Sequence, residues 1–330
     1  MRSRSSIFSS RVLGSALLWS VLAAVLVEWH GGRVLPVRHP AHEVDRLLYD
    51  LDHGRISARD TLFLGDSVGR QIALSLAHRN PGLLEPLASN AAIETPGQYY
   101  VLQRYLRHHP APRRVILMMG YPVGGQLQGD FTENYVQRGF LHVREILELA
   151  WARRSLRFGL VMAGYKLSPV FRHRIALQQK VPLLATANPV TDWFDLSGSA
   201  PPAPAAPHGL LDLLFLRLEQ RRREPEIADI YFQRLLRLLQ DRNIELVYLP
   251  PPLAESVAHK TAPNGLYGRQ VARLRELAAP FPGLQVHDRF FFYPDAWFLD
   301  GTHLSNRHLP PVAENYADLL DLPDPDEAAP

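Results

Sequence analysis

The sequence predicts an α/β protein built on a doubly wound parallel sheet. Short apolar runs of strand length, such as Leu62–Leu64 and Val115–Met119, alternate along the chain with segments that have helical spacing. The run Val115–Met119 is apolar throughout, which is typical of a parallel strand covered on both faces. Because sites in such sheets lie at the carboxyl ends of the strands, the residues that follow each run are the first candidates for function.

The composition is that of a globular protein with no strong preference for a charged partner. The chain has 330 residues, of which 46% are hydrophobic, and a net charge of only +3. The basic clusters Arg113-Arg114 and Arg221–Arg223 are short and lie near apolar residues, so we expect no nucleic-acid partner. Cysteine is absent, which excludes disulfides, a thiolate nucleophile and cysteine-based metal sites.

The N-terminus has the pattern of an uncleaved membrane anchor. Arg2, Arg4 and Arg11 precede an apolar run, Val12–Val27, of about 16 residues, longer than the usual core of a signal peptide. No small-x-small cleavage site follows it. The arginines predict a single-pass protein of the inner (cytoplasmic) membrane, with the N-terminus in the cytoplasm and the rest of the chain on the periplasmic or extracytoplasmic side. The alternative is a buried N-terminal helix of a soluble protein, which would be apolar on every face.

The chain divides into three expected parts, with the strands and helices of the sheet in the last of them. These parts are the cytoplasmic N-terminus and anchor (1–30), a tether with a polar helix (31–60), and the main α/β domain (61–330) with a helical insert at about 130–207. The expected strands are Leu62–Leu64, Leu84–Ala88, Val115–Met119, Ile244–Leu249 and Leu284–His287. The expected helices are Ala41–Leu51, a helix after Ser67, Tyr99–His108, Leu210–Gln240, Tyr267–Leu277 and Pro311–Leu320, with a loop over Ser89–Gly97. The insert is open to interpretation as a lid, an acceptor-binding surface or packing.

A candidate nucleophile follows the first strand. In the stretch Thr61–Arg70, TLFLGDSVGR, the apolar run stops at Gly65-Asp66-Ser67 and a helical pattern begins. Ser67 would then lie where backbone N–H groups are unpaired and the helix dipole is positive, so an oxyanion is favoured there. Gly-Asp-Ser is also ordinary turn and N-cap chemistry, which is the alternative.

A candidate base and its orienting carboxylate lie near the end of the chain. Asp300 and His303 are separated by Gly301 and Thr302, so one turn of a loop supplies both groups. A nucleophilic serine needs a base within hydrogen-bond reach, and the base needs a carboxylate that fixes its tautomer. The alternatives are a surface histidine, since the chain has 14, or a pair of metal ligands. Because no HExxH or other ligand set completes such a site, no metal is expected.

The two blocks together resemble the SGNH/GDSL hydrolase superfamily. Its members have a serine after the first strand and an Asp-x-x-His before the last helix, and Ser67, Asp300 and His303 match these positions. The resemblance implies a flavodoxin-like three-layer sandwich with a parallel central sheet, a Ser-His-Asp triad and no cofactor. It also implies an oxyanion hole from the amides of Ser67 and Gly97.

The third block of the family departs from the pattern in this sequence. The family has Gly-x-Asn-Asp there, whereas this chain has Gly120-Tyr121-Pro122-Val123 and lacks the oxyanion asparagine. Loss of one such donor costs about a hundredfold or more in rate. Either another group, such as Asn90 or Asn134, replaces it, or the protein does not work as a free-standing esterase.

The anchor and the insert narrow the resemblance to membrane-anchored SGNH proteins that modify cell-envelope polymers, such as those of alginate O-acetylation and D-alanine transfer. This resemblance implies a serine esterase or O-acyltransferase acting on an O-acetylated envelope glycan, with a multi-span membrane O-acyltransferase as partner. The alternative is a catalytically weak SGNH-fold scaffold or polysaccharide-binding component. The aromatic residues Phe290–Tyr293 and Trp297 form either a sugar platform or part of the core.

Overall fold

The structure is a computed structural model, and its description covers most of the sheet domain. The described residues are 42–88, 94–120, 122–123, 141–168, 227–299 and 303–322, with positions 15, 18–19, 22–23, 25–26 and 29–30 of the N-terminal segment. At the described N-terminal positions the backbone is helical, and Leu18, Trp19 and Trp29 are exposed. Among all these residues we find no helix whose length and apolar character would suffice to cross a membrane. Most of the expected anchor, the tether and much of the insert lie outside the described residues.

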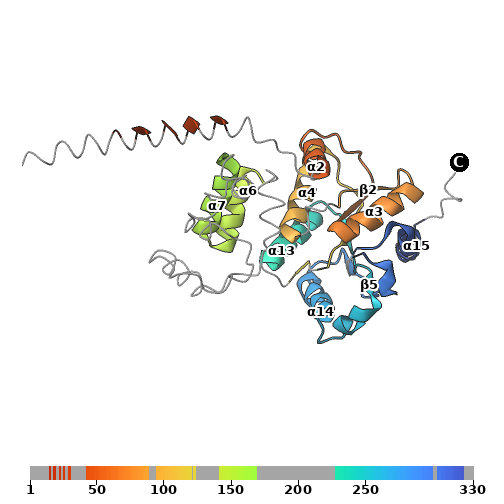
Figure 1. Cartoon of the computed structure of the whole chain (residues 1–330). Helices are drawn as coiled ribbons and strands as arrows, with labels where there is room; N and C mark the ends of the chain where they lie inside the picture. Colours follow the sequence, from red (N-terminus) through yellow and green to blue (C-terminus); the bar gives the residue numbers. More distant parts are fainter. Residues whose placement is uncertain are drawn as a thin grey trace, which may run out of the picture.

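A five-stranded parallel sheet forms the centre of the molecule (Figure 1). Its strand order is β2-β1-β3-β4-β6. The first strand therefore lies inside the sheet, with β2 on one side and the later strands on the other, so the order in which strands are added reverses at β1. The strands are β1 (Thr61–Gly65), β2 (Leu84–Pro86), β3 (Arg114–Met118), β4 (Glu245–Leu249) and β6 (Leu284–Val286). All five agree with the runs expected from the sequence, and the α/β class and the parallel sheet are confirmed.

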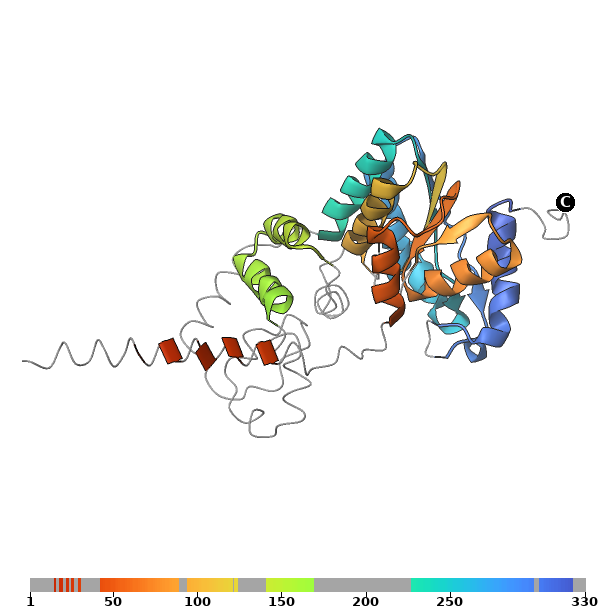
Figure 2. The ribbon, with the colours of Figure 1, turned by 90° about the horizontal axis from the view of Figure 1, so that it is seen from above.

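Helices cover both faces of the sheet because successive strand residues point to opposite sides. Leu62 and Leu64 of β1 lie in one apolar core and Phe63 lies in the other. The first core is covered by α2 (His42–Asp52), α4 (Thr95–His108), α13 (Ile227–Asp241) and α14 (Leu266–Ala278). The second is covered by α3 (Ser67–Arg79) and α15 (Leu309–Leu319). Figure 2 shows α4 and α13 on one side of the strands and α3 and α15 on the other.

The helix α4 begins earlier than the sequence predicted. The expected loop over Ser89–Gly97 ends in the structure at Glu94, and the helix starts at Thr95. Pro96 is the second residue of this helix, where its missing N–H has no intrahelical acceptor and its fixed φ suits the first turn. The buried side chains of Tyr100 and Tyr105 then follow at helical spacing.

Two helices of the expected insert are described. They are α6 (Val143–Arg153) and α7 (Leu156–Leu167), and they pack against each other. Glu145 of α6 is buried and accepts a hydrogen bond from the buried Arg104 of α4 at 2.8 Å, which ties the pair to the sheet domain. The outer side of the pair is apolar, since Leu147, Trp151 and Leu156 are 62%, 85% and 78% exposed.

Shorter elements complete the described fold. A two-stranded parallel sheet joins β5 (Leu253–Ala254) to β7 (Phe292–Tyr293). Three 3-10 helices, η2 (Glu255–Thr261), η3 (Asp295–Trp297) and η4 (Asn306–His308), lie in the C-terminal third of the chain. The last two flank the segment that carries His303.

The turn from β1 into α3 is packed directly against the end of β3. A Cβ added to Gly65 would lie 2.1 Å from the carbonyl oxygen of Met118, and one added to Gly69 would lie 2.5 Å from the same atom. Both distances are far below van der Waals contact, so only glycine fits at these positions. The amide of Asp66 donates to the same Met118 oxygen at 3.3 Å, which extends the β1–β3 pairing into the turn.

Replacement of Gly69 by alanine is expected to lower the free energy of unfolding by about 1–3 kcal/mol, because the added Cβ must push the helix away from β3. In a helix interior without such a contact, alanine is more stabilising than glycine by about 0.5–1 kcal/mol. A loss of stability in Gly69→Ala would therefore indicate the close approach to β3. Thermal unfolding of the full-length chain measures it. The control is Gly120→Ala, where an added Cβ meets nothing within 4 Å. Equal unfolding midpoints for the two variants would contradict the close approach.

Candidate active site

Ser67 is the first residue of α3 and follows the carboxyl end of the central strand β1. The N-cap of this helix is Asp66, whose Oδ1 accepts hydrogen bonds from the amides of Val68 and Gly69 at 3.0 and 3.2 Å. These bonds satisfy two of the unpaired N–H groups of the first turn. Among the described residues, the Ser67 amide has no hydrogen-bond acceptor, so it is available to a ligand at the positive end of the helix dipole.

The structure brings His303 to Ser67 across 236 residues of sequence. The distance between Nε2 of His303 and Oγ of Ser67 is 2.7 Å, and both side chains are half-buried. This is the reach that a general base needs in order to take the serine proton.

The segment that carries His303 is a tight loop closed on itself. Phe298 and Leu304 form an antiparallel bridge, and the amide of Leu299 donates to the carbonyl of His303 at 2.7 Å. One residue further out, the amide of Ser305 donates to the carbonyl of Trp297 at 2.8 Å. The third member of the predicted triad, Asp300, lies outside the described residues.

Asp66 joins the start of α3 to the loop that follows β3. Its Oδ2 accepts a hydrogen bond from the amide of Gly120 at 3.1 Å, in addition to the two helix amides on Oδ1. Burial raises the pKa of this carboxyl above its ordinary value, because the charged form loses its hydration. The three amide donors and the nearby His303 oppose this shift without cancelling it.

The expected second oxyanion donor is engaged elsewhere. The amide of Gly97 donates to the carbonyl of Glu94 at 3.0 Å. This corrects the expectation that Gly97 contributes to an oxyanion hole, because the helix α4 starts at Thr95 and takes this amide into its first turn. The amide of Gly120 is likewise donated to Asp66. Asn90 and Asn134, the other candidates, lie outside the described residues.

Two glutamines near the site did not emerge from the sequence. Gln98 of α4 is buried and donates from Nε2 to the carbonyl of Gly65 at 3.0 Å, which supports the turn from the opposite face of the sheet. Gln71 of α3 bonds the backbone of Leu304, the residue after His303. The one signal in the sequence is that Gln71 follows Ser67 by four residues, the spacing of one helix face.

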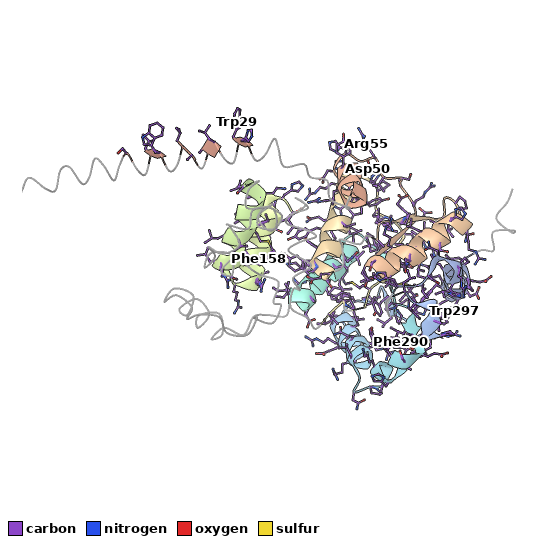
Figure 3. The ribbon with its side chains drawn as sticks, in the orientation of Figure 1. Trp29, Asp50, Arg55, Phe158, Phe290 and Trp297 are labelled. Atoms are coloured by element: carbon purple, nitrogen blue, oxygen red, sulfur yellow. The ribbon has the colours of Figure 1, made fainter. Side chains whose placement is uncertain are left out.

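Most of the aromatic residues before the His303 loop pack against other rings, whereas Phe292 is 38% exposed. Trp297 is labelled in Figure 3. Its ring stacks against Tyr293 and against His308, with centroid distances of 5.4 and 4.6 Å and nearly parallel planes. Phe291 packs edge-on against the buried Tyr316 of α15. Of the two interpretations of these residues, the described contacts therefore favour packing over a sugar platform.

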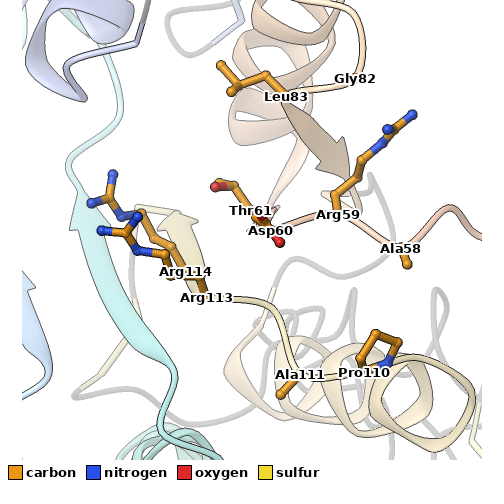
Figure 4. Close-up of a pocket in the computed structure, with 10 residues that line it drawn as sticks. All are labelled: Ala58, Arg59, Asp60, Thr61, Gly82, Leu83, Pro110, Ala111, Arg113 and Arg114. Carbon is orange, nitrogen blue, oxygen red and sulfur yellow. The ribbon is translucent and has the colours of Figure 1, made fainter.

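One cavity among the described residues lies away from Ser67. It has about 480 Å³ and lies at the amino end of β1, the opposite end of the strand from the serine. Figure 4 shows Arg113 and Arg114 on one side of it and Arg59 on the other, with the guanidinium group of Arg59 pointing away from the other two. Arg114 also pairs with Glu245 at 3.4 Å. Within the described ranges, no three His, Asp or Glu side chains gather as a set of metal ligands.

Comparisons with known proteins leave the family of the chain open. No family model and no curated protein matches the sequence. One solved structure that matches is described as "The structure of a putative platelet activating factor from Streptococcus pneumonia", with 12% sequence identity and a TM-score of 0.35. The match covers 93% of this chain and 99% of that chain. These values are too low to extend any property of that protein to this one.

The raised pKa of Asp66 predicts a pH-dependent contribution to stability. Because the folded protein binds this proton more tightly than the unfolded chain, the contribution is fully present below about pH 4 and is lost as the pH rises through the folded pKa. The free energy of unfolding of the natural chain minus that of Asp66→Asn should therefore fall as the pH rises from about 4.

Urea unfolding at a series of pH values measures this difference. Asp241→Asn, at an exposed position of α13, is the control for the loss of one surface carboxylate. A difference for Asp66→Asn that stays flat or rises with pH would refute the assigned direction of the shift.

Proposed function

We propose that this chain is a membrane-anchored serine esterase or acyltransferase of the SGNH type that acts on an acylated, O-acetylated cell-envelope glycan. The observation that carries the proposal is the 2.7 Å contact between Ser67 Oγ and His303 Nε2 at the start of α3. Serine beside a histidine at a helix N-terminus is an arrangement that supports nucleophilic attack on an acyl carbonyl. Asp300 is proposed as the carboxylate that orients His303.

In the first half-reaction, Oγ of Ser67 attacks the acyl carbonyl and its proton passes to Nε2 of His303. The oxyanion of the tetrahedral intermediate lies against the Ser67 amide and the positive end of α3. The intermediate collapses when the C–O bond to the donor breaks, and His303 returns the proton to the departing alcohol. The acyl group is then an ester of Ser67.

The second half-reaction decides between hydrolysis and transfer. His303 takes a proton from the incoming hydroxyl, which attacks the acyl-serine carbonyl, and the proton then returns to Ser67 as the ester breaks. Water as the incoming group gives hydrolysis and a free acid. A sugar hydroxyl gives transfer, and a multi-span membrane O-acyltransferase is then the proposed partner that supplies the acyl group.

The membrane location is part of the proposal and has two supports. The N-terminal arginines precede an apolar run whose described positions are helical and expose Leu18, Trp19 and Trp29. Tryptophan and leucine exposed on a helix suit a lipid environment better than water. The outer side of α6 and α7 exposes further apolar groups, including Trp151.

A second candidate function is a catalytically weak scaffold or polysaccharide-binding component of an envelope-modification complex. The observation that favours it is the oxyanion site, where the amides of Gly97 and Gly120 are both engaged by protein acceptors. Of the amides of Ser67, Gly97 and Gly120, that of Ser67 has no acceptor among the described residues. Loss of one donor costs about a hundredfold or more in rate.

A fluorophosphonate probe distinguishes the two functions. We expect the full-length chain to be labelled at Ser67, because the probe reacts with serines that are activated by a base. Labelling should be lost in Ser67→Ala and His303→Ala, and esterase kcat/KM in Ser67→Ala should fall by about ten thousand-fold or more. Mass spectrometry of the labelled peptide and a p-nitrophenyl ester assay provide the measurements.

Ser75→Ala, two turns further along α3, is the matched control and should be labelled like the natural chain. Asp300→Asn should retain the fold and lose most of the activity, since an amide cannot stabilise the imidazolium. An unlabelled natural chain, or equal labelling of Ser67→Ala, would favour the scaffold.

Transfer and hydrolysis give different products from the same acyl-enzyme. We expect the chain, incubated with an acetyl ester and an uronic-acid or other envelope oligosaccharide, to form acetylated sugar at the expense of free acetate. The Ser67→Ala variant should form neither product above background, which separates enzymatic transfer from spontaneous acylation. Release of acetate with no acetylated sugar for any acceptor would reduce the proposal to an esterase.

A further inference from the structure

We propose that Gln71 is a positioning residue that holds His303 within reach of Ser67. The inference rests on the proposed function for its catalytic meaning, and on the described contacts for its geometry. Gln71 lies one turn after Ser67 on α3, so the two side chains emerge from the same face of the helix. Leu304 is the neighbour of His303, so a group that holds Leu304 also holds the base.

The carboxamide of Gln71 binds both polar groups of Leu304. Its Nε2 donates to the carbonyl oxygen of Leu304 at 3.0 Å, and its Oε1 accepts from the amide of Leu304 at 3.2 Å. The two bonds form a pair like that between neighbouring strands. They join the helix of the nucleophile to the loop of the base at a point adjacent to both reacting side chains.

Only a carboxamide of this length satisfies both groups. A peptide unit offers one donor and one acceptor, and a glutamine side chain offers the complementary pair. Glutamate has no donor at neutral pH, and methionine, of similar length, has neither strong donor nor strong acceptor. Position 71 therefore requires glutamine for these two hydrogen bonds, whereas packing of α3 alone would accept other side chains of similar length.

The bonds within the His303 loop hold its two ends together, and the contact between Ser67 and His303 attaches the loop to α3 through the two reacting side chains. The bridge between Phe298 and Leu304 and the bond between Leu299 and His303 both join residues of the loop itself. Leu304 is fully buried in the core shared with α3 and α15, which limits its movement but is not directional. The Gln71 hydrogen bonds are directional, so they fix the orientation of the Leu304 peptide relative to α3. A shift of about 1 Å would take the Ser67–His303 pair out of good hydrogen-bond geometry.

The test uses the full-length chain with Gln71→Met, which keeps the length of the side chain and removes both hydrogen bonds. Ser75→Ala, on the same helix, is the matched control. Two readouts do not depend on turnover. They are the hydrogen-exchange rate of the Leu304 amide and the imidazole nitrogen resonances of His303, with Ser67→Ala as the reference for a lost Ser67–His303 bond.

We expect Gln71→Met to speed exchange of the Leu304 amide at least tenfold and to move the His303 resonances toward those of Ser67→Ala. We expect kcat for an acetyl ester to fall about 10- to 100-fold while KM changes less than about twofold, because the base is misplaced and substrate binding is not. Ser75→Ala should leave all of these values unchanged.

The proposal is overturned if Gln71→Met leaves the Leu304 exchange rate and the His303 resonances as they are in the natural chain. It is also overturned if kcat and KM change together with a matching loss of thermal stability, since that is the result of a purely structural role. If the natural chain is not labelled at Ser67, the proposed function fails. The exchange rate of the Leu304 amide and the His303 resonances in Gln71→Met still test whether Gln71 positions His303 in that case.

Discussion

The close approach of the first turn of α3 to the end of β3 is the constraint on which the site depends. The carbonyl oxygen of Met118 lies where a side chain at Gly65 or Gly69 would have to be, so the backbone passes as near as two chains can. This contact fixes the direction in which α3 leaves the sheet. Ser67, between the two glycines, is thereby held at the carboxyl edge of the sheet with its hydroxyl outward from the core.

Asp66 stabilises this turn with backbone amides that the proposed function would otherwise have as candidate donors. Its carboxylate takes three backbone amides, which secures the helix N-terminus and the loop at Gly120. An amide that donates to Asp66 is not available to donate to an oxyanion. The burial that makes the network rigid also raises the pKa of the carboxyl. The helix start is therefore well ordered, while the donors left for a substrate are few.

The contact between His303 and Ser67 depends on the second apolar core. Leu304 is buried with residues of α3 and α15, so the loop of His303 is drawn to the sheet by burial of its own neighbour. The two hydrogen bonds between Gln71 and Leu304 then fix the position of this loop along α3. The aromatic residues upstream, such as Trp297, extend the same packing, which explains why they are concentrated just before the loop.

The sequence by itself determined the class of the fold and the two ends of the site. Continuous apolar runs identified the three inner strands β1, β3 and β4, because a parallel strand buried on both faces leaves that pattern without reference to its neighbours. The edge strands β2 and β6 carry Glu85 and Gln285 at their centres and gave a weaker pattern. Ser67 and His303 were found from local motifs in the same way. The start of α4 was not predicted correctly, because Thr95 and Pro96 suit a loop as well as a helix N-terminus. Since the helix begins at Thr95, the Gly97 amide donates to Glu94 within its first turn.

Only the tertiary structure decided how these parts meet. The 2.7 Å contact between Ser67 and His303, the closure of Asp66 on Gly120 and the hold of Gln71 on Leu304 each join residues far apart in the chain. No local pattern encodes such contacts, because each depends on the order of the strands and on two cores that form only when the sheet is complete. The sequence specified the chemical groups of the site, and the packing of the sheet placed them within reach of one another.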